Sequence, residues 1–213
     1  TIEKRSQVLG HLSVGKLVMA VAGTHGKTTT STLAAWLNSA AADEGSAFLG
    51  GISRTFASNL VLGEGNRLVV EADEYDRSFL RLHPDVAVIT AADADHLDIY
   101  GDAAHIHEAF KAFAGQVSGT VIVRHGLDIT EGDTKAAIKT YGYDTPEADF
   151  YAEPLEGGRF NLHYPGGIIE DCVVGIPGWV NIENGTAAAA IALTYGLEPT
   201  KIKEALASFI GVK

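Results

Sequence analysis

The chain has 213 residues, of which 46% are hydrophobic and 20% are charged, and its formal net charge is −11. This composition is typical of one generous globular domain, or at most two small ones, and it argues against extended disorder. The excess of acidic residues argues against nonspecific binding to nucleic acids or anionic membranes, because their phosphates would be repelled.

The first apolar run, residues 17–22, predicts a strand, and a helical pattern follows over 26–42. Between them, residues 23–30 read Gly-Thr-His-Gly-Lys-Thr-Thr-Thr. A glycine turn at a helix start cradles phosphate, because its free N–H groups and the helix macrodipole attract anions. Lys27 adds a positive charge and Thr28 a hydroxyl for magnesium. The general P-loop pattern needs a glycine where this chain has Val21, so the loop is a shortened variant. A turn that merely joins strand to helix is the structural alternative.

A second predicted strand, residues 67–72, runs into Glu-Ala-Asp-Glu-Tyr-Asp at 71–76. The carboxyl edge of a doubly wound sheet is where such folds bind ligands, and acids there can hold the magnesium that bridges ATP phosphates. We expect Glu71, which directly follows the strand, to be a metal ligand. For Asp76, helix capping or solvation is an equally good explanation.

A third predicted strand, residues 85–90, leads into Asp-Ala-Asp-His-Leu-Asp-Ile-Tyr at 93–100. An isolated Asp-His pair is usually structural, so this cluster gains its meaning from the other two. A helix is predicted over 103–117, with Asp102 as its N-cap and one apolar face. A strand over 119–123 and a helical stretch near 130–139 are predicted next.

Residues 148–174 show aromatic and β-branched runs around a Pro-Gly-Gly turn, which predicts antiparallel hairpins. Helices are predicted over 180–195 and, beginning at Pro199, over 199–209. Strands that alternate with helices indicate βαβ units. The expected fold is therefore α/β, with a mostly parallel sheet, helices on both faces, a P-loop and a small antiparallel hairpin region at about 148–174.

Cys172 is the only cysteine, so an internal disulfide is impossible and a reducing, cytoplasmic location is expected. Its apolar neighbours predict a buried, inert thiol. No run reaches the ~18 apolar residues of a membrane span, and no signal-peptide pattern begins the chain.

The three polar segments at residues 23–30, 71–76 and 93–100, in this order and spacing, resemble the central ATP-binding domain of the Mur ligase family, and especially of its UDP-N-acetylmuramate:L-alanine ligases. Mur ligases are ATP-dependent amide ligases of cell-wall precursor synthesis. The resemblance extends from about residue 17 to the end and includes residues 48–54. It implies that residues 1–213 form this single domain. Since the chain begins with Thr1 rather than Met, we expect an excised piece that lacks the N-terminal UDP-binding and C-terminal domains.

The resemblance also implies roles for individual residues. Lys27, Glu71 and His96 are the implied catalytic residues, with Thr28 and Glu71 holding one Mg²⁺ and His96 helping to hold a second. ATP is expected to contact Gly23, Thr24, His25, Gly26, Lys27, Thr28 and Thr29. The UDP-sugar is expected to contact Gly50, Gly51, Ser53 and Arg54.

One stretch departs from the family pattern Gly-x-His-Asn-x-x-Asn-Ala, because residues 178–185 read Gly-Trp-Val-Asn-Ile-Glu-Asn-Gly. Val180 replaces the histidine. Asn181 and Asn184 share one helical face, and their amides can read adenine edges. Trp179 is a candidate to stack on the base. Helix capping is the alternative for both asparagines.

The implied reaction is ATP-driven amide formation. The carboxylate of UDP-N-acetylmuramate attacks the γ-phosphate, and the L-alanine amine then displaces phosphate from the acyl phosphate. Magnesium and Lys27 balance the charge between the two anions. Because an acyl phosphate hydrolyses in water, we expect this domain alone to bind nucleotide weakly and to show little or no turnover.

Three alternatives remain at this point. A ligase that recycles a tripeptide onto UDP-N-acetylmuramate shares the Glu-Ala-Asp-Glu-Tyr-Asp sequence, although Asp-His-Leu-Asp-Ile-Tyr favours the alanine ligases. Folylpolyglutamate synthases fit the acidic cluster and residues 50–54 less well. A nucleotide-binding module without catalysis is the rival from another class, and the metal ligands argue against it.

Overall fold

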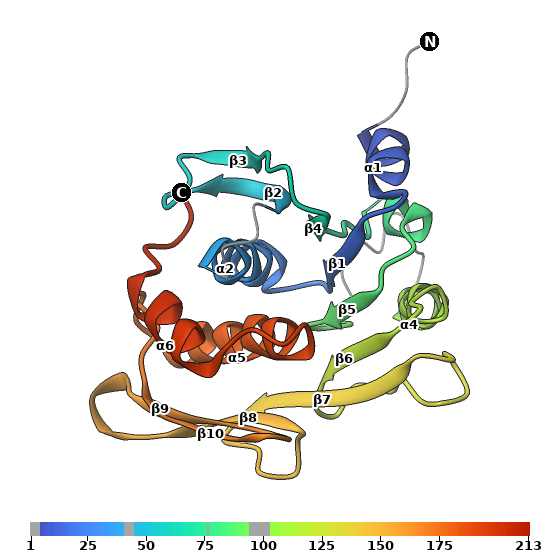
Figure 1. Cartoon of the computed structure of the whole chain (residues 1–213). Coiled ribbons are helices and arrows are strands. Elements are labelled where there is room, and N and C mark those ends of the chain that lie inside the picture. Colours follow the sequence, from blue (N-terminus) through green and yellow to red (C-terminus); the bar gives the residue numbers. More distant parts are fainter. Residues whose placement is uncertain (1–4, 41–44, 76, 94–102) are drawn as a thin grey trace.

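A ten-stranded sheet runs through the computed structural model, which describes residues 5–40, 45–75, 77–93 and 103–213 (Figure 1). The strand order is β10-β9-β8-β7-β6-β5-β1-β4-β2-β3. The strands are β1 Leu17–Ala22, β2 Ser46–Ser53, β3 Ser58–Val61, β4 Arg67–Glu71, β5 Val86–Ile89, β6 Thr120–Arg124, β7 Ala137–Tyr143, β8 Phe150–Pro154, β9 Phe160–Tyr164 and β10 Gly167–Cys172. The helices are α1 Arg5–Ser13, α2 Lys27–Ala40, α4 Ala103–Ala114, α5 Trp179–Thr194 and α6 Pro199–Ser208, with short 3₁₀ turns η1 Ser78–Arg81 and η2 Glu156–Gly158.

The middle of the sheet is parallel. β1 pairs in parallel with β4 on one side and β5 on the other, and parallel pairing continues outward to β2 and to β8. β3, β9 and β10 pair antiparallel with their neighbours. The predicted mostly parallel sheet and the hairpin region are thus confirmed, and the hairpins extend the same sheet rather than forming a separate unit.

Helices cover both faces of the sheet, as predicted. On one face, Met19 and Val21 of β1 pack with buried residues of α2, α5 and α6. On the other face, Val18 and Ala20 pack with α1, η1 and α4. Strands that are buried on both faces need nearly continuous apolar runs, which explains the sequence of β1. Among the described residues, no helix combines the length and the apolar character needed to cross a membrane.

The predicted helical stretch near 130–139 is wrong. Residues 131–133 form a turn, which is closed by the Asp133 carboxylate as it accepts hydrogen bonds from the N–H and the hydroxyl of Thr130 at 2.8 and 3.0 Å. β7 begins at Ala137 and pairs in parallel with β6. In addition, α4 ends at Ala114, three residues before the predicted end, and Asp102 lies outside the described residues.

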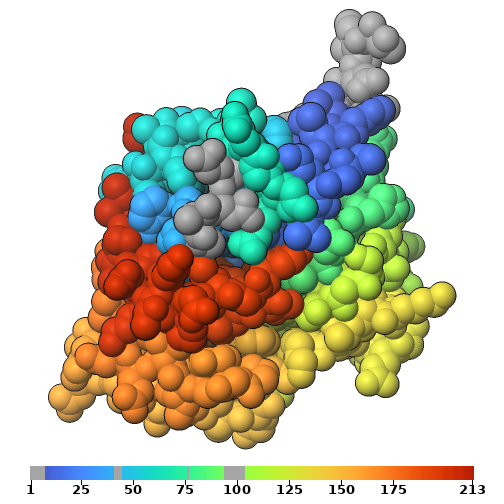
Figure 2. Space-filling view, viewed as in Figure 1, coloured from blue at the N-terminus to red at the C-terminus, as the bar shows by residue number. Residues whose placement is uncertain are grey.

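Small side chains let α5 lie close to its neighbours. Ala187, Ala188, Ala189 and Ala190 are all fully buried, between the sheet and α2. In the space-filling view, α5 and α6 form a red band between the cyan region around β2 and β3 and the orange hairpins (Figure 2). This close packing fixes the amino ends of α2 and α5 relative to each other.

The segment after α6 runs beside β2. Ser53 and Val212 form an antiparallel bridge. The Arg54 N–H donates to the Gly211 carbonyl, and the Lys213 N–H donates to the Ile52 carbonyl, each over 2.9 Å. Residues 211–213 are thereby attached to the end of β2.

Candidate functional site

The loop of residues 23–26 connects the central strand β1 to α2, at the carboxyl edge of the sheet. Gly23 and Gly26 have φ angles of 133° and 80°, which side chains other than hydrogen rarely allow. A Cβ atom on Gly23 would also lie 2.2 Å from the Thr90 hydroxyl. Both glycines are therefore required for this loop shape, and the free N–H groups of the α2 amino end face the same edge.

The segment that follows β5 holds the loop in place. The buried Thr90 hydroxyl hydrogen-bonds to the carbonyls of Ala22, at 3.1 Å, and of His25. Thr24 is nearly buried, and its N–H donates to the Ala91 carbonyl over 3.1 Å. Sequence reasoning missed Thr90; the available signal was a polar residue at the end of a strand next to β1.

Lys27 turns its side chain back over the loop. Its ammonium donates to the Gly23 carbonyl at 2.7 Å and to Oε1 of Glu74 at 2.8 Å. The Lys27 side chain is 14% exposed and that of Glu74 only 1%. The sequence placed Glu74 in an acidic cluster but did not identify it as the partner of Lys27.

The two predicted magnesium ligands lie together. Thr28 Oγ1 is 3.1 Å from Oε1 of Glu71, while Oε2 accepts hydrogen bonds from the Ser31 hydroxyl at 3.0 Å and the Gly50 N–H at 2.9 Å. Adjacent oxygens in an octahedral Mg²⁺ shell are about 3 Å apart, so the Thr28 and Glu71 oxygens fit one such shell. Ser31, which is fully buried, orients the carboxylate and was not predicted.

The rest of a magnesium shell would come from phosphate oxygens and water. Within the described ranges, no three His, Cys, Asp or Glu side chains converge as a metal site. His96, the predicted ligand of a second ion, lies outside the described residues. His25 is exposed, with Nε2 3.8 Å from Oδ2 of Asp93, and Thr29 is half-buried on α2.

The four residues predicted to contact the sugar separate into two groups. Gly50 and Gly51 of β2 lie against the magnesium ligands: added Cβ atoms would come within 2.0 Å of Glu71 Oε1 and 3.0 Å of Thr28 Cγ2, respectively. Ser53 is fully buried, and its hydroxyl accepts the Phe56 N–H at 3.2 Å. Arg54 is exposed.

The amino end of α5 approaches the loop through Asn184. This side chain is 7% exposed and accepts a hydrogen bond from the Thr30 hydroxyl at 3.3 Å, and a Cβ on Gly26 would lie 2.7 Å from its Oδ1. Asn181 is half-buried, and its amide donates to the Pro177 carbonyl at 2.6 Å. The N-cap of α5 is Gly178, without a side-chain cap, so neither asparagine caps the helix.

At position 180, where the family pattern has histidine, this chain has an exposed valine. Val180 is 47% exposed and Trp179 55% exposed. The Trp179 ring lies 5.9 Å from that of Tyr143, tilted by 47°, so this ring pair stands beside the amino end of α5. Nearby, Arg124 pairs with Glu183 at 3.1 Å.

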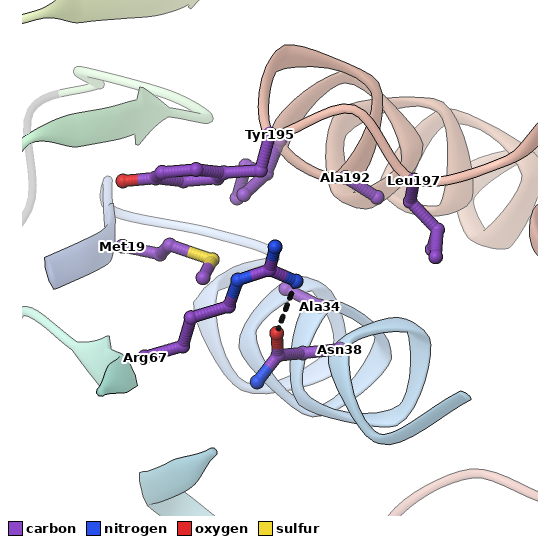
Figure 3. Close-up of a pocket in the computed structure, with 8 residues that line it drawn as sticks. Met19, Ala34, Asn38, Arg67, Ala192, Tyr195 and Leu197 are labelled. Carbon is purple, nitrogen blue, oxygen red and sulfur yellow. Dashed lines mark hydrogen bonds between the residues drawn. The ribbon is translucent and has the colours of Figure 1, made fainter. Parts of the chain in front are cut away.

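A small separate pocket lies toward the carboxyl ends of α2 and α5 (Figure 3). Arg67 donates to Asn38 Oδ1 at 3.4 Å, and its guanidinium lies 5.8 Å from the centre of the Tyr195 ring. Asn38 is about 16 Å along the α2 axis from Lys27, at 1.5 Å per residue. This pocket is therefore distinct from the phosphate loop.

The chain matches the family model for the Mur ligase middle domain over residues 21–192. It is 44% identical over 218 residues to UDP-N-acetylmuramate--L-alanine ligase of Phocaeicola vulgatus, an alignment that covers 99% of this chain and 47% of that relative. The chain spans about half the length of the curated relatives it matches.

Two solved structures have the same fold. UDP-N-acetylmuramate-alanine ligase MurC from Thermotoga maritima superposes with a TM-score of 0.80 at 25% identity, covering 97% of this chain and 47% of that one. UDP-N-acetylmuramate:L-alanyl-gamma-D-glutamyl-meso-diaminopimelate ligase from Neisseria meningitides superposes with a TM-score of 0.86 at 24% identity, covering 98% and 71%. The architecture of the sheet and its helices is thus shared with ligases of this type.

Proposed function

The chain belongs to the Mur ligase middle-domain family, and from that premise we propose that it is the ATP-binding domain of a UDP-N-acetylmuramate:L-alanine ligase of peptidoglycan precursor synthesis. The observation that carries the proposal is the meeting of Lys27, Thr28 and Glu71 at one edge of the sheet, beside a loop whose tight shape requires glycine at positions 23 and 26. A cytoplasmic location, which suits a chain with one buried thiol, is part of the proposal.

The residues have separate tasks in this proposal. The amides of residues 23–28 and the Lys27 ammonium bind the triphosphate of ATP. Thr28 and Glu71 hold a magnesium ion, which supplies positive charge to the phosphates when bound. His96, outside the described residues, is proposed to help hold a second ion.

The two organic groups of the substrates are proposed to lie on either side of the loop. Asn184, Asn181 and Trp179 at the amino end of α5 are proposed to contact the nucleoside. Gly50 and Gly51 of β2, with Arg54 directly after this strand, are proposed to contact the UDP-sugar. Gly50 contacts Glu71 directly, so the sugar carboxylate and the phosphates would meet close to the Thr28 and Glu71 oxygens.

In the proposed reaction, the carboxylate of UDP-N-acetylmuramate attacks the γ-phosphorus and ADP leaves. The L-alanine amine then attacks the acyl carbon of the resulting acyl phosphate, and phosphate leaves as the amide forms. Lys27 and the loop amides stabilise the charge that shifts between phosphate oxygens. Water has to be excluded, but His25 in the loop and Arg54 after β2 are both exposed. We therefore propose that N- and C-terminal domains of the same ligase complete the site.

We propose that the amine substrate is L-alanine rather than a tripeptide. Curated relatives such as the alanine ligase of Phocaeicola vulgatus, 44% identical across nearly the whole chain, support this assignment, whereas the two solved structures, at 24% and 25% identity, do not separate the two acceptors. A competition assay between L-alanine and the tripeptide, on the full-length ligase, separates the two. A nucleotide-binding module without catalysis is disfavoured because Thr28 and Glu71 keep the spacing of magnesium ligands.

The first experiment is calorimetric titration of this chain with a non-hydrolysable ATP analogue, with and without magnesium, beside Lys27→Ala. Magnesium-dependent binding that disappears in Lys27→Ala is the expected result. If the folded, unaltered chain does not bind, the titration is repeated on the full-length ligase, and absence of binding there contradicts the proposed site. Turnover has a separate expectation: alanine-dependent phosphate release by this domain alone would contradict the proposal that further domains complete the site.

A further inference from the structure

Glu74 is a buried carboxylate that contacts the phosphate-loop lysine without belonging to the magnesium pair. Its Oε1 accepts from the Lys27 ammonium at 2.8 Å, and its side chain is only 1% exposed. The Thr28 and Glu71 contact at 3.1 Å forms without it. The site therefore contains a second acid, three residues after Glu71, whose Oε1 contacts the Lys27 ammonium.

The backbone that carries Glu74 is held by hydrogen bonds that do not involve Lys27. The Asp73 carbonyl accepts the Phe79 N–H at 3.1 Å and the Ser78 hydroxyl at 3.0 Å. The Glu74 carbonyl accepts the Arg77 N–H at 2.9 Å, closing the turn that leads into η1. A buried carboxylate on a backbone held in this way restricts the rotamers of Lys27, a long and flexible side chain.

The charges at the loop have a consequence for its ligand. Lys27 contributes one positive charge, and Glu71 and Glu74 contribute one negative charge each, so the three side chains together carry one net negative charge. A triphosphate is a polyanion and is repelled by such a set at short range, where the surroundings screen charge poorly. A magnesium ion bound with the phosphates reverses this balance.

We propose that Glu74 is a positioning residue that holds the Lys27 ammonium over the Gly23 carbonyl and, through its charge, restricts the phosphate loop to magnesium-loaded nucleotide. The inference rests on the proposed function, because it assumes that the loop binds a nucleoside triphosphate. It goes beyond that function in assigning the rejection of metal-free nucleotide to one named carboxylate.

The test compares Glu74→Gln with the unaltered chain by titration with a non-hydrolysable ATP analogue, once with magnesium and once with EDTA. Asp128→Asn is the matched control, because it also removes a carboxylate from a lysine, Lys111 of α4, but from an exposed position that does not contact Lys27. In Glu74→Gln, affinity for the metal-free analogue should rise about tenfold, while affinity for the magnesium form changes by less than about threefold. The control should leave both affinities unchanged.

Equal selectivity for the magnesium form in Glu74→Gln and the unaltered chain would overturn the inference, even if the variant were less stable. Absence of any binding by the unaltered full-length ligase would instead overturn the proposed function, so the two failures are distinguishable. A second variant, Glu74→Asp, keeps the charge but withdraws the carboxylate from Lys27. It should bind the magnesium form several-fold more weakly and still reject the metal-free form, and acceptance of the metal-free form would contradict the role of charge. Circular dichroism establishes whether each variant is folded. If Glu74→Gln does not fold, the inference is tested with Glu74→Asp.

Discussion

The backbone N–H of Gly50 donates a hydrogen bond of 2.9 Å to Oε2 of Glu71, so that β2 touches the carboxylate that we assign to magnesium. A Cβ at this position would lie 2.0 Å from Glu71 Oε1, so any larger residue would force the carboxylate to move. Gly50 therefore sets the position of the carboxylate as well as leaving room for it.

We predict that Gly50→Ala displaces the Glu71 carboxylate and weakens magnesium-dependent nucleotide binding. Overpacking typically costs about 1–3 kcal/mol, and a loss of that size in binding free energy would lower affinity about 5- to 150-fold. Calorimetry with the ATP analogue measures the change. Gly132→Ala is the control, because its Cβ would meet only the Thr130 hydroxyl at 3.5 Å. Unchanged binding by a folded Gly50→Ala would show that Glu71 is not a ligand.

Asn184→Asp should weaken nucleotide binding as well, by placing a negative charge next to Gly26 in the phosphate loop. The side-chain oxygen is buried there and accepts the Thr30 hydroxyl, so a carboxylate would keep that bond while repelling phosphate. A loss of about tenfold is expected from one added charge at short range. Asn59→Asp on the exposed strand β3 adds the same charge away from the loop and should have no effect on binding. Equal losses in both variants would show that the effect is one of overall charge.

The Cys172 thiol should be unreactive in the native chain. It is fully buried, and burial raises its pKa to about 11. Thiolate is the reactive form, so at pH 8 iodoacetamide should modify the native chain far more slowly than the chain in urea, as followed by mass spectrometry. Rapid native modification would contradict the packing of the β10 end against α6.

The free energy of unfolding should depend on pH through Asp149. Burial raises the pKa of this carboxyl, but hydrogen bonds from Lys139 and from the Thr140 N–H outweigh burial, and the net pKa lies below the ordinary value of 3.8. A carboxyl whose pKa is lower in the folded state stabilises the fold above its ordinary pKa, and this stabilisation is lost as the pH falls through the folded-state value.

Asp149→Asn should therefore lower the free energy of unfolding by about 1–3 kcal/mol at pH 7, and the difference from the unaltered chain should shrink below about pH 4. Urea unfolding at a series of pH values measures it. Asp128→Asn, at an exposed ion pair, should show a much smaller difference at every pH. A difference for Asp149→Asn that persists undiminished at low pH would contradict the role of its charge.

The sequence predicted well those features that depend on neighbouring residues. The strand predicted at 17–22 is β1, and the helix predicted to begin at Pro199 is α6. The meeting of Thr28 and Glu71 was also predictable, because parallel strands bring their carboxyl ends to one edge of a sheet. The structure adds the distance between Thr28 Oγ1 and Glu71 Oε1, which is 3.1 Å.

Other features depended on contacts that local sequence does not encode. Residues 135–139 read Lys-Ala-Ala-Ile-Lys, a good helical sequence, yet Ala137 begins β7 because pairing with β6 overrides local propensity. The Lys27 and Glu74 pair depends on a turn that folds residue 74 back toward a loop 47 positions earlier. No pattern within either segment indicates that contact.

Hydrogen bonds connect residues 211–213, through β2, to the Glu71 carboxylate. A pull on Lys213 is resisted first by its own hydrogen bond to Ile52 and by those around Ser53 and Arg54, which lie at the end of the strand that also contains Gly50. Gly50 is in turn bonded to Glu71. Tension on residues 211–213 would thus be delivered along β2 to the Glu71 carboxylate, so that movement beyond α6 and the geometry of the phosphate edge are joined by one strand.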